Sequence, residues 1–177
     1  MFKWIIKSIK NDYEKWLYYR EDSLKAWIYY HIRKEIEDTE KNIYTEYNLK
    51  DIGSEKYFSD IVITDGVKDN NWSIPVIKEI FEIKFSYSSL KRPLGEDLQK
   101  IIEISEQEIK INFFMIYESK REIDVIIENI KNILLENKQV IKDNIKIYFL
   151  ISKLNKEMEK DEIYLYEYIN WELTEII

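Results

Sequence analysis

Two kinds of hydrophobic spacing alternate along this chain of 177 residues, and this alternation limits the possible folds more than any other feature. In some segments apolar residues recur every three to four positions, which is typical of amphipathic helices. In others they alternate with polar residues or run without interruption, which is typical of strands. Because the two patterns follow one another along the chain, the sequence predicts a mixed α/β protein.

The spacing predicts a central mixed β-sheet of about five to six strands flanked by helices. Helices are expected in the first 38 residues, with a break near 20–23, and again at 93–108 and from 123 onward. A capping box, Ser119-Lys120-Arg121-Glu122, is expected to begin the last of these helices. Strands are expected at 42–49, 57–64, 76–85, 111–117, 144–151 and 162–169.

The length is that of one domain. We therefore expect a single domain over 1–177, with an N-terminal helical extension at 1–20, a core at 21–118 and a C-terminal α-β extension at 119–177. Hydrophobic residues make up 45% of the chain and aromatic residues 15%, too much for a disordered protein.

Composition also excludes several kinds of site. The chain has no cysteine, so disulfides, zinc ribbons and thiolate-bound clusters are excluded, and the one histidine, His31, cannot form a multi-histidine metal site. No apolar run is long enough to span a membrane, and the start does not resemble a signal peptide, so a cytoplasmic location is expected. The net charge of −7 argues against binding nucleic acid through charge alone.

One constellation suggests chemistry. Asp60 stands near the start of one predicted strand, and the triplet Glu82-Ile83-Lys84 lies inside the next. Acid-x-Lys triplets occur four times, about as often as composition predicts. Only this one lies within an apolar strand and follows a strand that opens with an aspartate. Because strand side chains alternate, Glu82 and Lys84 should share one face, and a hairpin can bring Asp60 beside them.

Charges among apolar strand residues are costly unless they are paired or bind a metal. Mg²⁺ prefers oxygen ligands, so Asp60 and Glu82 are candidate metal ligands. Lys84 is the candidate to orient or deprotonate an attacking water and to stabilise charge on phosphorus. The alternative is a solvent-facing side of the sheet with a cross-strand salt bridge.

The acid followed by Glu-x-Lys in this element order resembles the PD-(D/E)xK nuclease superfamily, which has the restriction-endonuclease-like fold. The family core, α-β-β-β-α-β, matches residues 24–117 in order. The resemblance implies Mg²⁺- or Mn²⁺-dependent hydrolysis of DNA, with the backbone carbonyl of Ile83 as a further metal ligand. The chain departs from the family pattern in two respects: Ser59 rather than proline precedes Asp60, and the cysteines of the branch that carries an iron–sulfur cluster are absent.

The resemblance also implies accessory residues. Family members often carry a glutamate on the first core helix, for which Glu21 is the first candidate and Glu35 the second. Many carry a polar residue on the helix after the motif, where Gln99 or Lys100 stands, and Gln99 is the residue assigned. Glu46 on the first strand is a further possibility.

We therefore predict a metal-dependent deoxyribonuclease, most simply an endonuclease, in a defence or mobile-element setting. DNA is the expected partner, with a homodimer or a partner protein to strengthen the grip of an acidic chain. The small basic loop around Lys91 and Arg92 is a candidate for phosphate contact. One alternative is an inactive domain of this fold that binds protein or nucleic acid. Another is an unrelated α/β protein whose motif is accidental.

Overall fold

The computed structural model describes residues 5, 8, 9, 12, 21–37, 39–52, 57–65, 76–86, 89–105, 109–138, 141–153 and 162–176. The expected N-terminal helix at 1–20 lies almost wholly outside these residues. The described elements are α2 Glu21–Glu35, β1 Lys41–Asn48, a 3₁₀ turn Leu49–Ile52, β2 Phe58–Asp65, β3 Ile77–Ser86, α3 Lys91–Ser105, β4 Lys110–Ser119, α4 Ile123–Glu136, β5 Ile145–Lys153, β6 Glu162–Ile169 and β7 Glu172–Glu175.

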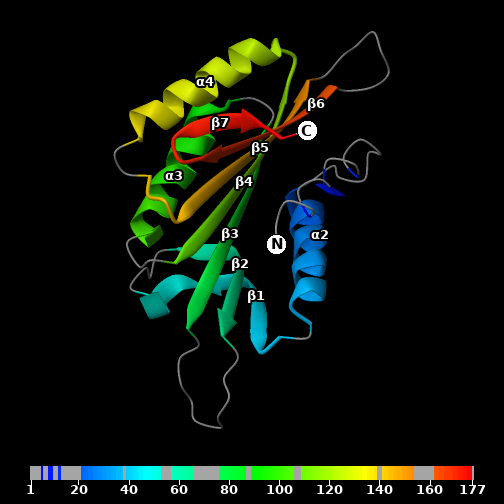
Figure 1. The fold of residues 1–177 in the computed structure, drawn as a ribbon, viewed down its shortest axis with the longest axis vertical. Coiled ribbons are helices and arrows are strands. Elements are labelled where there is room, and N and C mark those ends of the chain that lie inside the picture. The colour runs from blue at the N-terminus through cyan, green and yellow to red at the C-terminus, as the bar shows by residue number, and fades with distance from the viewer. Residues whose placement is uncertain are drawn as a thin grey trace.

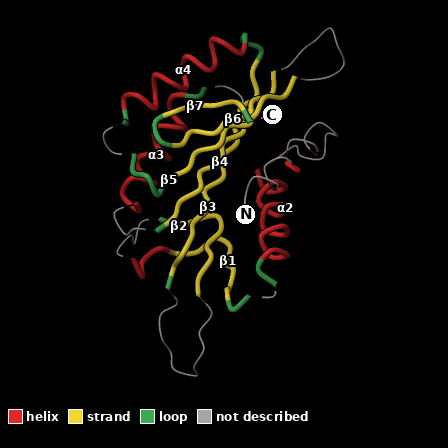
Figure 2. The backbone as a smooth tube through the Cα atoms, in the orientation of Figure 1, coloured by secondary structure: helices red, strands yellow, loops and turns green. Residues whose placement is uncertain are grey.

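The described strands form one mixed sheet in which neighbours in sequence are neighbours in space, in the order β1-β2-β3-β4-β5-β6-β7. β3, β4 and β5 are parallel, and the outer strands pair antiparallel. The α/β class expected from the hydrophobic spacing is confirmed, and the tube in Figure 2 shows the strands running through the middle of the molecule. None of the described helices is long and apolar enough to cross a membrane.

The helices cover both faces of the sheet (Figure 1). α3 and α4 connect the parallel strands and lie on one face, and α2 lies on the other. Crossovers between parallel strands are right-handed. When each new strand is added on the same side of the preceding one, right-handed crossovers place all of their helices on one face of the sheet. This arrangement leaves β2 and β3 between α2 on one side and α3 on the other.

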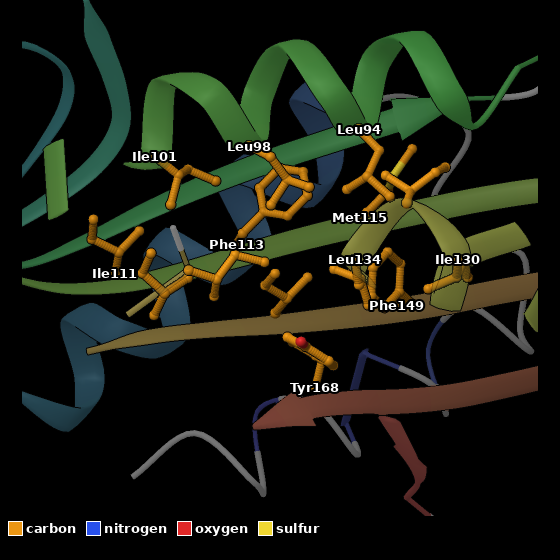
Figure 3. Packing of buried hydrophobic residues seen from close by; sticks show 14 of the residues in the cluster. Leu94, Leu98, Ile101, Ile111, Phe113, Met115, Ile130, Leu134, Phe149 and Tyr168 are labelled. Carbon is orange, nitrogen blue, oxygen red and sulfur yellow. The ribbon is translucent and has the colours of Figure 1, made fainter. Parts of the chain in front are cut away.

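Each face has its own hydrophobic core. The core under α3 and α4 is the larger and contains the fully buried Phe113 and Phe149, packed against Leu98 and Leu134 (Figure 3). Burying an aromatic side chain of this kind contributes roughly 2–3 kcal/mol. The core under α2 contains Ile28, Ile61, Ile83 and other buried side chains. Odd-numbered residues from Phe81 to Phe85 face this second core, so Glu82 and Lys84 face α3.

Two details of the predicted fold are wrong. The sheet has seven described strands rather than five or six, and the strand that was not predicted is β7. It follows β6 through a tight turn in which Asn170 and Trp171 both have positive φ, 51° and 71°. Such turns usually contain glycine. This turn has none, so the sequence did not indicate a hairpin here. The predicted capping box does not form either. Ser119 ends β4, Glu122 caps α4 without a side-chain hydrogen bond, and the Ser119 hydroxyl accepts a hydrogen bond from the Arg121 amide.

Candidate functional site

β2 and β3 separate at one end of their hairpin, and the candidate site lies at this opening. Their pairing stops at Ile61 and Phe81. Beyond that point Asp60 takes the place of a strand partner, because its Oδ2 accepts a hydrogen bond of 2.7 Å from the backbone N–H of Ile83. The N–H and C=O of one strand residue point to the same side, so the Ile83 carbonyl is also directed toward this opening.

α2 supplies a second carboxylate to the same edge of β3. Glu21 is the first residue of α2, and its Oε2 accepts a hydrogen bond of 3.2 Å from the backbone N–H of Phe85. An acidic residue in the first turn is favoured by the helix dipole. The tertiary contact shows that Glu21 also closes the gap left where β2 has ended.

α3 contacts Glu82 and Lys84 through charged side chains. Lys100 Nζ lies 2.7 Å from Glu82 Oε2 and also donates to the backbone carbonyl of Phe58. Lys84 Nζ lies 3.7 Å from Asp97 Oδ2, which is too far for a hydrogen bond. Glu82 and Lys84 therefore share one face, as the strand alternation predicts, and each has a partner of opposite charge on α3.

Glu82 is buried in an unusual way for a carboxylate. Only 6% of the residue is exposed, and its Oε1 atom is buried without a hydrogen bond to any described residue. Burial raises the pKa of Glu82 to about 7, the charge of Lys100 opposes this rise, and the charge of Asp60 adds to it. The hydroxyl of Ser59 lies close enough to lower the pKa slightly but makes no hydrogen bond of ordinary geometry.

Asp97, like Glu82, is a carboxylate whose pKa is affected by burial and by nearby charges. Burial raises the pKa of its carboxyl, the ammonium groups of Lys84 and Lys100 oppose the rise, and the charges of Asp60 and Glu21 add to it. Its Oδ2 atom is buried without a hydrogen bond among the residues that the structure describes. Carboxylates from α2, β2, β3 and α3 thus influence one another's charge across a single site.

A lysine occupies the space between three of the carboxylates. Lys25 Nζ lies 2.6 Å from Asp60, 3.1 Å from Glu21 and 3.6 Å from Glu46. Burial lowers the pKa of Lys25, but the hydrogen bonds and charges of Asp60 and Glu21 outweigh this effect and raise the pKa above its ordinary value. The ammonium therefore stays charged and acts as an internal cation among these acids.

Glu46 reaches Lys25 through a strained backbone. Its φ is 49°, in the left-handed region that residues other than glycine seldom adopt. Thr45 and Tyr47 pair with β2, but Glu46 opposite Asp60 does not. Such strain is typical of functional sites, where the surrounding structure holds the residue in place.

Changing Glu46 to glycine should relieve this strain, since glycine adopts positive φ without a steric cost. We expect the unfolding free energy to rise by about 1 kcal/mol in urea titration. An exposed glutamate on the other face of the molecule, Glu128, has ordinary helical backbone, so Glu128→Gly should instead destabilise α4 by about 1 kcal/mol. A loss of stability in Glu46→Gly as large as that in Glu128→Gly would show that the backbone at this position is not strained.

The structure brings together four of the predicted site residues, Asp60, Glu82, Lys84 and Glu21. Gln99 is not among them, because it is exposed and donates to Glu103 at 3.2 Å on the outer face of α3. Its neighbour Lys100, the other candidate on this helix, takes the inward position. Glu35 is exposed at the far end of α2, roughly 20 Å from Glu21 along the helix.

Lys25 and Asp97 join the site without having been predicted. Each stands one helical turn from a residue that was a candidate, Lys25 four residues after Glu21 and Asp97 three before Lys100. Residues at these spacings share a helix face, so the spacing was a usable signal. Charged residues are so frequent on both helices that this signal did not stand out from the solvent-facing side chains.

The donor set suits a hard divalent cation, although the described residues include no closed group of three acidic or histidine side chains around a common point. The candidate oxygens are those of Asp60 and Glu82 and the Ile83 carbonyl. Mg²⁺ and Mn²⁺ bind through one or two carboxylates, with water and phosphate completing the shell. The buried Oε1 of Glu82 is the observation that fits such a cation, since no described residue supplies the hydrogen bond that a buried carboxylate oxygen needs.

No protein-family model matches the chain, and no curated protein sequence matches it significantly.

Proposed function

We propose that this protein is a Mg²⁺- or Mn²⁺-dependent nuclease that hydrolyses phosphodiester bonds in DNA, built on a restriction-endonuclease-like fold. The observation that carries the proposal is the convergence of Asp60, Glu82 and Lys84 with Glu21 where β2 and β3 separate. The strand order and the helix on each face support the fold assignment. The resemblance to PD-(D/E)xK nucleases supplies the reaction type.

Asp60, Glu82 and the carbonyl of Ile83 are the residues that would hold the ion. A bound divalent ion would polarise the phosphoryl group and lower the pKa of a bound water. Glu21 would serve the same site from α2, where it already holds the edge of β3. The Ile83 amide holds one oxygen of Asp60 and Lys25 holds the other, so the carboxylate has a defined position before any ligand arrives.

Lys84 would act on the substrate. Its side chain is 37% exposed, and its contact with Asp97 at 3.7 Å is a loose ion pair. The ammonium can therefore turn toward a phosphate or an attacking water without breaking a strong hydrogen bond. In that position it would stabilise the negative charge that develops on phosphorus and orient the water for attack.

The proposal is tested by incubating the purified full chain with single-stranded, duplex and supercoiled plasmid DNA, with Mg²⁺ or Mn²⁺. We expect cleavage that EDTA abolishes and that Glu82→Ala lowers to background. Glu128→Ala, which removes an exposed glutamate from α4, should cleave like the wild type. The proposal fails if the wild type cuts no substrate faster than Glu82→Ala.

A second candidate is a domain of the same fold that binds protein or nucleic acid without hydrolysis. The observation that favours it is that Lys25 and Lys100 form close ion pairs with Asp60 and Glu82. Calorimetric titration of the folded chain with Mn²⁺ separates the two functions, since the binding domain should take up no ion.

The position of Lys25 leads to a prediction about metal affinity. Replacing Lys25 with methionine keeps the length of the side chain but removes the charge that lies 2.6 Å from Asp60. The remaining carboxylates then repel one another, and a divalent cation relieves that repulsion. We expect Mn²⁺ to bind on the order of tenfold more tightly, a change of about 1.4 kcal/mol, in calorimetric titration.

The matched control is Lys34→Met, which removes an exposed lysine from the other end of α2. It should leave the Mn²⁺ affinity unchanged. An unchanged or weaker affinity in Lys25→Met would mean that the lysine assists the ion instead of competing with it.

A further inference from the structure

A cavity of about 340 Å³ lies between the N-terminal end of α3, the C-terminal end of β4 and α4. Its volume is within the range of small-molecule binding sites, roughly 300–1,000 Å³. α3 and α4 lie on the same face of the sheet (Figure 1). None of the residues assigned to the candidate site above lines this cavity.

The cavity has an apolar side and a polar rim. Its apolar side is lined by four buried residues, Leu90, Tyr117, Ile126 and Ile133. A flat aromatic ring can pack against such a surface while polar groups at the rim fix its orientation.

Two cations at the rim have no acidic partner among the residues that the structure describes. Neither Lys91 nor Arg121 forms an ion pair with a described residue, whereas Arg92 pairs with Glu96 and Lys153 with Glu122. Lys91 and Arg121 therefore leave positive charge unneutralised on a chain of net charge −7. An arginine without a carboxylate partner offers paired N–H donors to a phosphate.

Two amides stand beside these cations. Asn129 and Asn132 line the cavity one helical turn apart on α4, and their side chains hydrogen-bond to none of the described residues. An amide donates and accepts at once, which matches the mixed edge of a nucleobase. Glu136, one turn further along, is an acceptor for a sugar hydroxyl or an exocyclic amine.

The cavity is also close to the candidate site. Tyr117 pairs with Ser86, two residues beyond Lys84, and the side chains of Lys84 and Tyr117 point to the same face of the sheet. Strand spacing and rise place their Cα atoms roughly 8 Å apart. Ser86 donates to the carbonyl of Ser89 at 2.9 Å, which ties the rim of the cavity to the end of β3.

We propose that this cavity binds one unstacked nucleotide of a single nucleic-acid strand. The base lies on the apolar side and is read by Asn129 and Asn132, and a phosphate binds Lys91 and Arg121. A stacked and paired base cannot enter, so the proposed nuclease acts on single strands or frayed ends in preference to intact duplex. This last step rests on the proposed function, whereas binding itself does not.

The test measures binding without metal, so that it does not depend on cleavage. In EDTA, a fluorescein-labelled single-stranded oligonucleotide is titrated with the full chain, and its anisotropy is recorded. We expect Arg121→Ala and Asn132→Ala to weaken binding at least tenfold and fivefold. Both residues are exposed at the rim, and circular dichroism verifies that the variants fold.

The matched control is Lys131→Ala, which removes an exposed cation from α4 outside this cavity. It should bind like the wild type, and deoxynucleoside monophosphates should compete where inorganic phosphate does not. Equal losses in Lys131→Ala and Arg121→Ala would overturn the proposal, as would duplex DNA binding as tightly as the single strand. If the chain binds the single strand but does not cleave DNA, the cavity proposal holds and the nuclease proposal fails. If the chain cleaves DNA and Arg121→Ala binds as well as the wild type, the nuclease proposal holds and the cavity proposal fails.

Discussion

Replacing Lys84 with methionine is expected to lower the rate of metal-dependent DNA cleavage by roughly 10²–10³-fold, the usual effect of removing one group that stabilises transition-state charge. Methionine preserves the length and the apolar stem of the side chain. The contact of Lys84 with Asp97 is loose, at 3.7 Å, so its loss should disturb the fold little. The affinity for Mn²⁺ should stay within about threefold of the wild type, because an ammonium is not a metal ligand. Single-turnover cleavage and Mn²⁺ calorimetry measure the two effects separately.

Lys78 provides the matched control on the same strand. It lies six residues before Lys84, roughly 20 Å away along β3, and pairs with Asp65 on the surface. Lys78→Met should cleave DNA at the wild-type rate. If Lys84→Met also cleaved at the wild-type rate, Lys84 would have no part in the reaction, and the Glu-x-Lys motif would lose its chemical meaning here.

The second large effect concerns the dependence of stability on pH. Burial raises the pKa of Glu82 from 4.5 to about 7 in the folded protein. Between these two values the unfolded chain has lost the Glu82 proton while the folded chain still holds it. The unfolded state therefore binds fewer protons, and the free energy of unfolding falls as pH rises. By about pH 8, ionisation of Glu82 should have lowered the free energy of unfolding by about 3 kcal/mol. Below pH 4 this loss should be absent.

Glu82→Gln isolates this contribution because glutamine does not titrate. Urea titrations of both proteins from pH 4 to 8 should show the wild type losing stability relative to Glu82→Gln as pH rises. Lys100 loses its partner in the variant, so the test rests on how the difference between the two proteins changes with pH and not on its absolute size. A difference between the two proteins that does not change with pH would show that folding does not shift the pKa of Glu82. Mn²⁺ should reverse the loss at pH 8, since a bound cation favours the charged carboxylate.

The sequence predicted the elements better than the details of their ends. The strands around Asp60 and Glu82 were placed within one residue of β2 and β3, because their β-branched runs have no competing helical pattern. The seventh strand was missed because four residues, Glu-Leu-Thr-Glu, carry too little periodicity to be recognised. The capping pattern around Ser119 is local and predicts a helix cap, whereas the place of Ser119 at the end of β4 is set by pairing with β5.

The site was predictable only in part for a related reason. Strand alternation requires Glu82 and Lys84 to share a face, and this follows from the sequence alone. Which residue of α3 reaches Glu82 depends on the rotation of that helix on the sheet. The packing of Leu94, Leu98 and Ile101 sets this rotation, and it turns Lys100 inward and Gln99 outward.

By itself, the sequence determined the α/β class, the order of the strands along the chain and the shared face of Glu82 and Lys84, since each follows from spacing along one segment. The tertiary structure decided where β2 and β3 separate, which amides Asp60 and Glu21 satisfy there, and that Lys25 lies among three acids. These features join residues from 4 to 64 positions apart, and the distances between them depend on helix rotation and strand divergence. Both are set by the packing of the two cores, which no local pattern encodes.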